Sequence, residues 1–258
     1  MTTFVSAIFD IYNNKDDEVD IRKSKQKRLD RFEELAKTGI QIVLFCCPVY
    51  ELLLQPMLAK YSNVKLLFVI KFQDLLAYKI INNYENKFQK QLTLPFNRSE
   101  IKDTREYMIL MNSKAEFIRR AIEANIFNSQ YFCWIDFSIL YMFPEREAPL
   151  AKLKHISNQA GFNNKKCIIM PGCNQKNNND YLNEINWRFC GGFFVGDKES
   201  LLEFTATAIN MFYIFLSITN KLIWEVNYWN WLEQGNMFNN LVWYQANFSQ
   251  YIINNIPL

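Results

Sequence analysis

The amino-acid sequence predicts an α/β fold with a mostly parallel mixed central sheet flanked by helices. The first 70 residues alternate short apolar segments with amphipathic ones, in the order strand, helix, strand, helix, strand. The apolar and aromatic run Gln130–Phe143 indicates a further buried strand. The chain has 258 residues, of which 50% are hydrophobic, and no linker or internal repeat divides it. We therefore expect a single domain that spans residues 1–258.

The N-terminal part is expected to form the parallel strands. The helix predicted at Lys23–Lys37 has its apolar residues on one face and stops at Thr38-Gly39. A polar loop over residues 13–20 separates this helix from the first strand. The other elements expected here are, in order, strand Phe4–Asp10, strand Ile40–Cys46, helix Pro48–Lys60 and strand Val64–Ile70.

The rest of the chain is expected to surround the Gln130–Phe143 strand. One long amphipathic helix is predicted over Asp103–Ala124, with Asp103 or Thr104 near its N-terminus. The other elements expected are helix Asp74–Lys90, loop Leu92–Lys102, a loop-rich region over 158–183 around a short strand at Cys167–Met170, strand Arg188–Val195, and helices Lys198–Thr219 and Leu222–Gln234.

Charge and cysteine content narrow the class of protein. A formal net charge of +3 does not call for a nucleic-acid partner. The basic cluster Arg22–Arg31 is either a solvated helix face or a patch for an anionic sugar nucleotide, phosphate or lipid surface. Six cysteines without a CxxC pair, and a single histidine, His155, argue against a structural zinc site. The cysteines lie mostly in apolar surroundings, so we expect buried free thiols and a reducing, cytoplasmic compartment.

Two segments bear on whether the chain associates with a membrane. The N-terminus lacks the basic and apolar regions of a secretory signal. The uncharged run Phe204–Thr219 is shorter than the roughly 20 residues that a membrane span needs. We therefore expect a buried core helix there and no transmembrane segment.

Asp136 is the residue that points most clearly to a functional site, because it is the only group in the run Gln130–Phe143 that is charged at neutral pH. Burying an unpaired carboxylate is costly, so Asp136 should meet a cation or a hydrogen-bond network. An aspartate near the end of a buried strand, followed by small Ser138, is where α/β enzymes place a metal ligand. The alternative is a carboxylate that caps backbone amides. GxGxxG, Walker A and Ser-His-Asp patterns are absent from the sequence.

Six segments, in order along the chain, carry a family resemblance. They are FVSAIFDI (4–11), RFEELAKTGIQIVLF (31–45), KDTREYMILMNSKAEF (102–117), FCWIDFSI (132–139), WRFCGGFFVGDKESL (187–201) and WEVNYWNWLE (224–233). From about residue 4 to 245 the chain resembles the HtrL/YibB family of proposed glycosyltransferases, and more distantly the glycogenin-type transferases with a GT-A fold. The WIDF and FCGGFF segments are the more specific parts of the resemblance.

The resemblance implies transfer of a sugar from a nucleotide-diphosphate donor, expected to be a UDP-sugar, to a hydroxyl of a glycan or glycoprotein. Asp136, with Ser138 at the second position, would hold Mn²⁺ or Mg²⁺ against the diphosphate charge. This sequence has Asp136-Phe137-Ser138 in place of the usual DxD motif, and residues 243–250 contain no histidine to complete a metal shell. Both departures weaken the expectation of a metal.

The resemblance also implies roles for other residues. Lys114 would contact the diphosphate, and Gly191 and Gly192 would line the donor sugar. Glu225, in an aromatic setting, should have a raised pKa or a specific partner, and would act as a base or stabiliser at the reacting centre. Asn227 would hydrogen-bond sugar hydroxyls. The remaining candidate donor-binding residues are Ser6, Ala7 and Asp10 for the base and ribose, and Arg98, Lys102 and Asn112 near the phosphates. A solvated lysine and a packing glycine pair are the structural alternatives for Lys114 and the glycines.

Two other functions stay open at this stage. A catalytically weakened GT-A scaffold would bind a glycan or nucleotide sugar without turnover, and the single carboxylate and missing histidine favour it modestly. A nucleotidyltransferase ranks lower, because the chain lacks a Gly-rich basic N-terminal loop.

Overall fold

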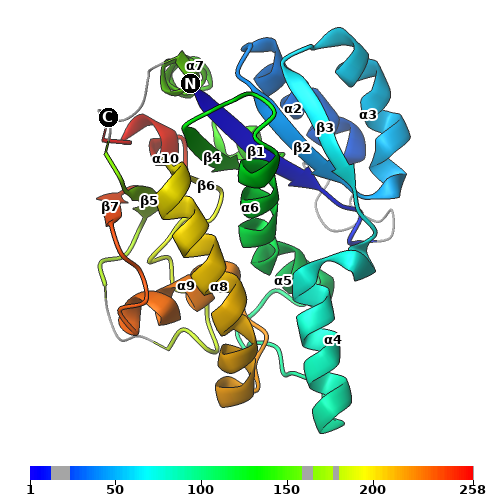
Figure 1. Cartoon of the computed structure of the whole chain (residues 1–258), viewed down its shortest axis with the longest axis vertical. Coiled ribbons are helices and arrows are strands. Elements are labelled where there is room, and N and C mark those ends of the chain that lie inside the picture. Colours follow the sequence, from blue (N-terminus) through cyan, green and yellow to red (C-terminus); the bar gives the residue numbers. More distant parts are fainter. Residues whose placement is uncertain (13–23, 159–164, 177–179, 258) are drawn as a thin grey trace.

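The computed structural model describes residues 1–12, 24–158, 165–176 and 180–257, and its strands form one seven-stranded sheet flanked by helices (Figure 1). The polar loop expected at 13–20 and the first residues of the basic cluster lie outside the described residues. The strand order is β3-β2-β1-β4-β6-β5-β7. The strands are β1 (Thr2–Ile8), β2 (Ile42–Cys46), β3 (Val64–Val69), β4 (Tyr131–Ile135), β5 (Ile168–Gly172), β6 (Phe193–Asp197) and β7 (Leu241–Gln245).

Strand β6 gives the sheet its mixed character. It runs antiparallel to both of its neighbours, β4 and β5, whereas all the other pairs of adjacent strands are parallel. The prediction of an α/β fold with a mostly parallel mixed sheet is confirmed. Because of this topology, every strand except β6 ends at the same edge of the sheet, and β6 begins there.

The helices cover the sheet and extend beyond that edge. They are α2 (Lys25–Lys37), α3 (Pro48–Lys60), α4 (Leu76–Phe88), α5 (Arg105–Asn112), α6 (Lys114–Ala124), α7 (Glu147–Asn158), α8 (Lys198–Thr219), α9 (Glu225–Gln234) and α10 (Tyr251–Asn254). Helix α6 packs on β1 and β4, and α8 packs on β4 and β6, with the two helices side by side in front of the sheet (Figure 1). Helices α7 and α10, and strand β7, were not predicted from the sequence.

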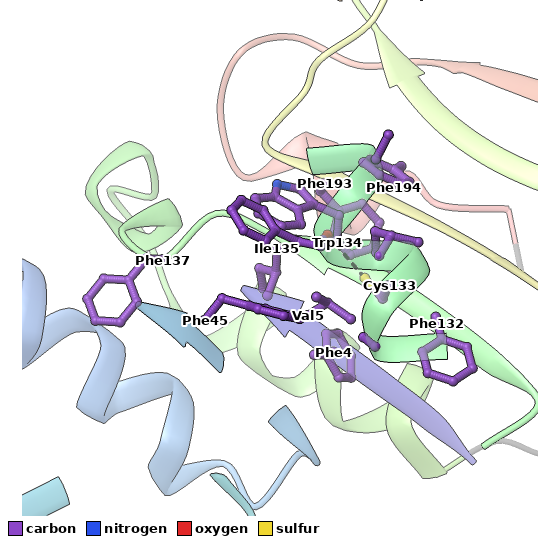
Figure 2. Close-up of a cluster of buried hydrophobic side chains, with 14 of the residues drawn as sticks. Phe4, Val5, Phe45, Phe132, Cys133, Trp134, Ile135, Phe137, Phe193 and Phe194 are labelled. Carbon is purple, nitrogen blue, oxygen red and sulfur yellow. Dashed lines mark hydrogen bonds between the residues drawn. The ribbon is translucent and has the colours of Figure 1, made fainter. Parts of the chain in front are cut away.

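The core is strongly aromatic around β1 and β4. Figure 2 shows Phe4 and Val5 of β1 close to Trp134 and Ile135 of β4, all of them buried. Phe117 of α6 stacks on the Trp134 ring with 6.1 Å between the ring centroids. Burial of each such side chain contributes about 1.5–3 kcal/mol, so these strands give rigid support to the residues that follow them.

Two predicted strands are shorter than expected. The strand predicted at Gln130–Phe143 ends at Ile135, and a 3₁₀ helix follows at Ile139–Met142. The strand predicted at Arg188–Val195 begins only at Phe193, which leaves Gly191 and Gly192 before it. The Asp136 amide donates to the Gly192 carbonyl oxygen (2.9 Å), so the end of β4 and the start of β6 are tied together. Asp136 and the glycine pair therefore lie side by side at the edge of the sheet.

The prediction of one helix over Asp103–Ala124 is wrong, because the helix is interrupted at Ser113, between α5 and α6. The Asn112 side-chain amide donates to the carbonyl oxygens of Met108 and Ile223, each at 2.8 Å. The Ser113 hydroxyl donates to the Ile109 carbonyl oxygen (2.9 Å). Such side-chain bonds to the backbone compete with helix continuation. Lys114 consequently occupies the first position of α6.

One described helix, α8, is long and apolar enough to cross a membrane by length and composition alone. In the structure 39% of its most apolar window is buried, and the helix packs on α6 and the sheet. A core helix meets the same criteria of length and composition.

All six cysteines are free; five are buried, and Cys173 is half-buried. The sulfur atoms of Cys173 and Cys190 are 3.5 Å apart, and the hydrogen bond from Cys190 lowers the pKa of the Cys173 thiol. We therefore expect a thiol reagent at pH 8 to modify Cys173 first, and the other cysteines only after unfolding. Peptide mass spectrometry after timed labelling measures this, with Cys173→Ser as the control. Equal labelling of several cysteines in the folded protein would contradict the burial pattern.

Candidate functional site

A cavity opens at the edge where the parallel strands end. Residues from the end of β1, the turn after β4, the segment before β6 and the start of α9 line it, together with residues of α2, α5 and α6. Crevices at the carboxyl ends of strands are where open α/β sheets bind ligands. The lining includes the charged residues Arg28, Lys102, Lys114, Asp136 and Glu225.

Lys114 is the centre of a buried ionic cluster. Its side chain is 2% exposed, and its ammonium group donates to the Gly191 carbonyl oxygen (2.7 Å) and to Glu225 Oε1 (2.8 Å). The same nitrogen lies 3.1 Å from Asp136 Oδ1. An ammonium group has three donors, so these three oxygens satisfy all of them. A buried lysine is stable only with such partners.

The two carboxylates decide the protonation of Lys114. Burial alone would lower its pKa, but the negative charges of Asp136 and Glu225 outweigh burial and hold the pKa above its ordinary value. Lys114 is therefore a permanent cation at neutral pH. With both carboxylates ionised, the cluster carries one more negative charge than positive.

The carboxylates differ in their access to the cavity. The Asp136 side chain is 38% exposed, whereas that of Glu225 is 6% exposed. The indole nitrogen of Trp134 donates to Asp136 Oδ1 (2.7 Å), the oxygen that also faces Lys114. Asp136 is thus held in one orientation by two donors while remaining open to a ligand. Glu225 has the specific partner that its aromatic surroundings led us to expect.

The glycine pair makes room for these acids. A Cβ atom added to Gly191 would lie 2.2 Å from Glu225 Oε1, well inside contact distance. A Cβ atom on Gly192 would lie 3.4 Å from Asp136 Oδ2, which is an ordinary contact. Neither glycine has a positive φ, since Gly39 is the one described glycine that does. Gly191 is therefore required for close approach to Glu225 and not for its backbone conformation.

The side chains around Asp136 do not supply enough ligands for a bound metal ion. No group of three or more His, Cys, Asp or Glu side chains capable of holding a metal occurs in the part of the chain that the structure describes. Asp136 Oδ1 is already engaged by Trp134 and Lys114, and the Lys114 ammonium would repel a second cation. The Ser138 hydroxyl is buried without a hydrogen-bond partner, but one hydroxyl and one carboxylate oxygen fall short of the roughly six oxygen ligands such ions take.

Residues 1–225 match the family described as "bacterial protein of unknown function (HtrL_YibB)". The chain belongs to the HtrL/YibB family. The match includes Lys114, Asp136, the glycine pair and, as its last residue, Glu225. The family resemblance inferred from the sequence is confirmed.

Other comparisons add little to the HtrL/YibB assignment. A comparison with curated proteins found no match. The 4-diphosphocytidyl-2C-methyl-D-erythritol synthase from Anaerococcus prevotii is 9% identical over 98% of this chain and 92% of its own, with a TM-score of 0.41. Mouse xyloside xylosyltransferase 1 in its apo form is 8% identical over 96% of this chain and 86% of its own, with a TM-score of 0.43. Scores this low carry no conclusion about activity.

In this HtrL/YibB protein the structure brings eight of the predicted site residues to the cavity. They are Ala7, Lys102, Lys114, Asp136, Ser138, Gly191, Gly192 and Glu225. The donors of Lys114 are spent on protein oxygens, so it holds the carboxylates in place of the diphosphate that the sequence suggested.

The other predicted residues, Ser6, Asp10, Arg98, Asn112 and Asn227, are not part of the cavity lining. Ser6 is fully buried in β1. Asp10 lies 3.8 Å from Lys25, and Arg98 donates to the Pro95 carbonyl oxygen. The Asn112 side chain donates to two backbone carbonyl oxygens, as described above.

Asn227 positions a loop of this HtrL/YibB protein. Its amide nitrogen donates to the carbonyl oxygens of Tyr181 (2.6 Å) and Glu184 (2.7 Å), and its oxygen accepts from the Asn186 amide (2.8 Å). The side chain is fully buried. Both of its donors are used, so the prediction that Asn227 bonds sugar hydroxyls gives way to a role in holding residues 181–186.

Sequence reasoning missed Tyr107, Trp187 and Phe248, which also line the cavity, whereas the further lining residue Arg28 belongs to the basic cluster Arg22–Arg31. Burial raises the pKa of Tyr107 well above its ordinary value, and the charges of Glu225 and Asp136 add to the effect. Its phenol therefore keeps its proton. Helical spacing is the sequence signal that could have found Tyr107. The cavity is lined from one face of the predicted helix by Tyr107, Leu110, Met111, Lys114 and Phe117.

Proposed function

We propose that the protein is a glycosyltransferase that moves a sugar from a nucleotide-diphosphate donor to a hydroxyl of an acceptor. The observation that carries the proposal is the Lys114–Asp136–Glu225 cluster, in which an accessible carboxylate is fixed by a buried ion pair at the carboxyl edge of the sheet. Catalytic groups need such preorganisation. The resemblance of the WIDF and FCGGFF segments to proposed glycosyltransferases supports the reaction class, with a UDP-sugar as the donor.

Asp136 is the proposed catalytic residue. The new bond joins the acceptor oxygen to the anomeric carbon, and the bond from that carbon to the diphosphate breaks, its electron pair leaving with the nucleotide. The acceptor proton goes to the Asp136 carboxylate. Lys114 and Glu225 are positioning residues, since Lys114 holds Asp136 Oδ1 and Glu225 in turn holds Lys114.

The donor lies, in this proposal, at the β1 end of the cavity. Arg28 and Lys102 line it there and supply positive charge for the diphosphate. Tyr12 also lines the cavity, where its ring can stack on the base, and its hydroxyl donates to the Lys102 carbonyl oxygen (2.9 Å). This placement leaves Lys114 in its ion pairs.

A binding scaffold without turnover is the second candidate function. The incomplete set of metal ligands at Asp136 and Ser138 favours it. Such a scaffold would bind a glycan or a nucleotide sugar; where it binds the donor, only bond cleavage separates it from the first candidate.

The test is a thermal-shift panel of UDP, GDP, CMP and their sugars, each with and without Mn²⁺, followed by assays of donor hydrolysis. A saturating nucleotide should raise Tm by roughly 5–10 °C. Asp136→Asn should keep this shift and lose hydrolysis by about 100-fold or more. The exposed variant Asp74→Asn, on the 3₁₀ helix Phe72–Asp74, is the control. Binding without hydrolysis would favour the scaffold, and no shift with any nucleotide would contradict the transferase and leave a glycan-binding scaffold.

A further inference from the structure

The order of the strands gives the cavity two chemically different ends. Ala7 lies at the end of β1, Asp136 follows β4, and Gly192 precedes β6. Beyond β6 the sheet continues through β5 to β7. Neighbouring strands are about 4.8 Å apart, so β7 lies about 19 Å from β1 along this edge. Asp136 stands between the cationic end and the β5–β7 end.

Two aromatic side chains line the β5–β7 end. The Trp187 carbonyl oxygen accepts from the amide of Cys173, the residue directly after β5 (2.8 Å), and Phe248 follows β7. Their ring centroids are 4.5 Å apart, with the planes tilted by 50°. Phe248 is 43% exposed, and both rings line the cavity. An open aromatic corner therefore lies on the far side of Asp136 from Arg28 and Lys102.

Hydrogen bonds and an ion pair hold the Trp187 side of this corner in place. The Trp187 carbonyl oxygen accepts from two backbone amides, those of Cys173 (2.8 Å) and Asn174 (3.0 Å). The next residue, Arg188, donates to both carboxylate oxygens of Glu233, at 2.8 and 2.6 Å. Asn227 holds the segment before Trp187, as described above. A site fixed before its ligand arrives loses less entropy on binding.

We propose that Trp187 and Phe248 form the acceptor subsite and that the acceptor is a carbohydrate. The inference rests on the proposed function. A sugar ring presents a face of C–H groups that packs on aromatic rings, and hydroxyls around its rim. The exposed residues Asn174 and Asn247 neighbour the two aromatic residues. The Asn174 side chain donates to Asn186 Oδ1 and Asn247 Oδ1 accepts from Ser249, so the Asn174 oxygen and the Asn247 amide nitrogen are the atoms that would meet such hydroxyls. A ring stacked here presents one hydroxyl toward Asp136, with the donor on the opposite side.

The experiment compares wild type with Phe248→Ala and a matched control, Phe96→Ala. Phe96 is 86% exposed and is not part of the cavity lining. Binding of methyl glycosides and disaccharides, in the presence of UDP, is followed by saturation-transfer NMR. Phe248→Ala should weaken carbohydrate binding about tenfold, whereas Phe96→Ala should leave it unchanged. Where transfer is measurable, Phe248→Ala should raise the acceptor KM by a larger factor than the donor KM.

Carbohydrate binding that is the same in Phe248→Ala and wild type overturns the inference, and so does the absence of carbohydrate binding to wild type. A rise in donor KM equal to that in acceptor KM also overturns it, because the corner would then serve the donor. Failure of the proposed function is a separate result: donor hydrolysis is absent from wild type, while carbohydrate binding still depends on Phe248.

Discussion

Replacing Lys114 by methionine is expected to lower the free energy of unfolding by about 3–5 kcal/mol, the usual cost of removing one partner of a buried ion pair. The variant leaves Asp136 and Glu225 without the cation that lies 3.1 and 2.8 Å from their oxygens. It should also abolish donor hydrolysis, because the two carboxylates then repel each other. Urea denaturation followed by circular dichroism measures the stability change.

Two further variants make the Lys114 prediction specific. Lys79→Met breaks an exposed ion pair with Asp74 (3.4 Å) and should change stability by about 1 kcal/mol or less. Adding Glu225→Gln to Lys114→Met removes one uncompensated charge and should restore part of the lost stability. If Lys114→Met alone were as stable as Lys79→Met, the cluster would not be a paired, buried unit.

The raised pKa of Lys114 fixes the pH range over which this stabilisation is present. A lysine whose pKa is raised by folding contributes fully below its ordinary pKa of 10.5 and loses the contribution as pH rises through its folded value. The stability difference between wild type and Lys114→Met should therefore hold constant at neutral pH and shrink only above pH 10.5.

Gly191→Ala is expected to reduce donor turnover by about 100-fold and stability by about 1–3 kcal/mol. The added methyl group would lie 2.2 Å from Glu225 Oε1 and 3.0 Å from Val226 Cγ1, so the Glu225 carboxylate must move away from Lys114. Steady-state kinetics and thermal unfolding measure the two effects.

Gly192→Ala is the matched control for Gly191→Ala. The nearest atom to its added methyl group is Asp136 Oδ2 at 3.4 Å, so stability should change by no more than about 0.5 kcal/mol. Equal losses of stability in the two variants would mean that the pair is sensitive to any side chain, and that contact with Glu225 is not the cause.

Asp136 shows how far sequence reasoning reaches into the site. A lone carboxylate in an apolar run must find a partner, and that demand pointed to the edge of the sheet where the cavity lies. The family resemblance named Lys114 only as a contact of the diphosphate, and its pairing with Asp136 was not predicted, because nothing local to Asp136 fixes which distant cation it meets. That Lys114 also bonds Glu225 and the Gly191 carbonyl is a consequence of tertiary packing.

The elements that sequence reasoning missed depend on contacts between distant segments. The break at Ser113 involves a bond from Asn112 to Ile223, a residue 111 positions away. Strand β7 has the sequence LVWYQ, which is as apolar as that of β2, but only Tyr244 of it is buried in the structure. So short an apolar run does not fix its own structure, and its place as a strand depends on its pairing with β5. The meeting of Trp187 with Phe248 follows from the placement of β7 beside β5, which no local pattern encodes.

The pairing of β1 with β4 has a consequence for how the chain folds. Thr2 lies opposite Tyr131 in the sheet, so β1 waits during synthesis for more than a hundred residues before it has both neighbours. Such distant pairing slows folding, because the chain loses the entropy of closing a long loop before the stabilising contacts form. The apolar edge of β1 is exposed in the growing chain until β4 emerges, which is the condition under which nascent chains aggregate or recruit chaperones. Mutations that weaken this one pairing should therefore reduce the yield of folded protein in cells more than they lower the melting temperature of the molecules that do fold.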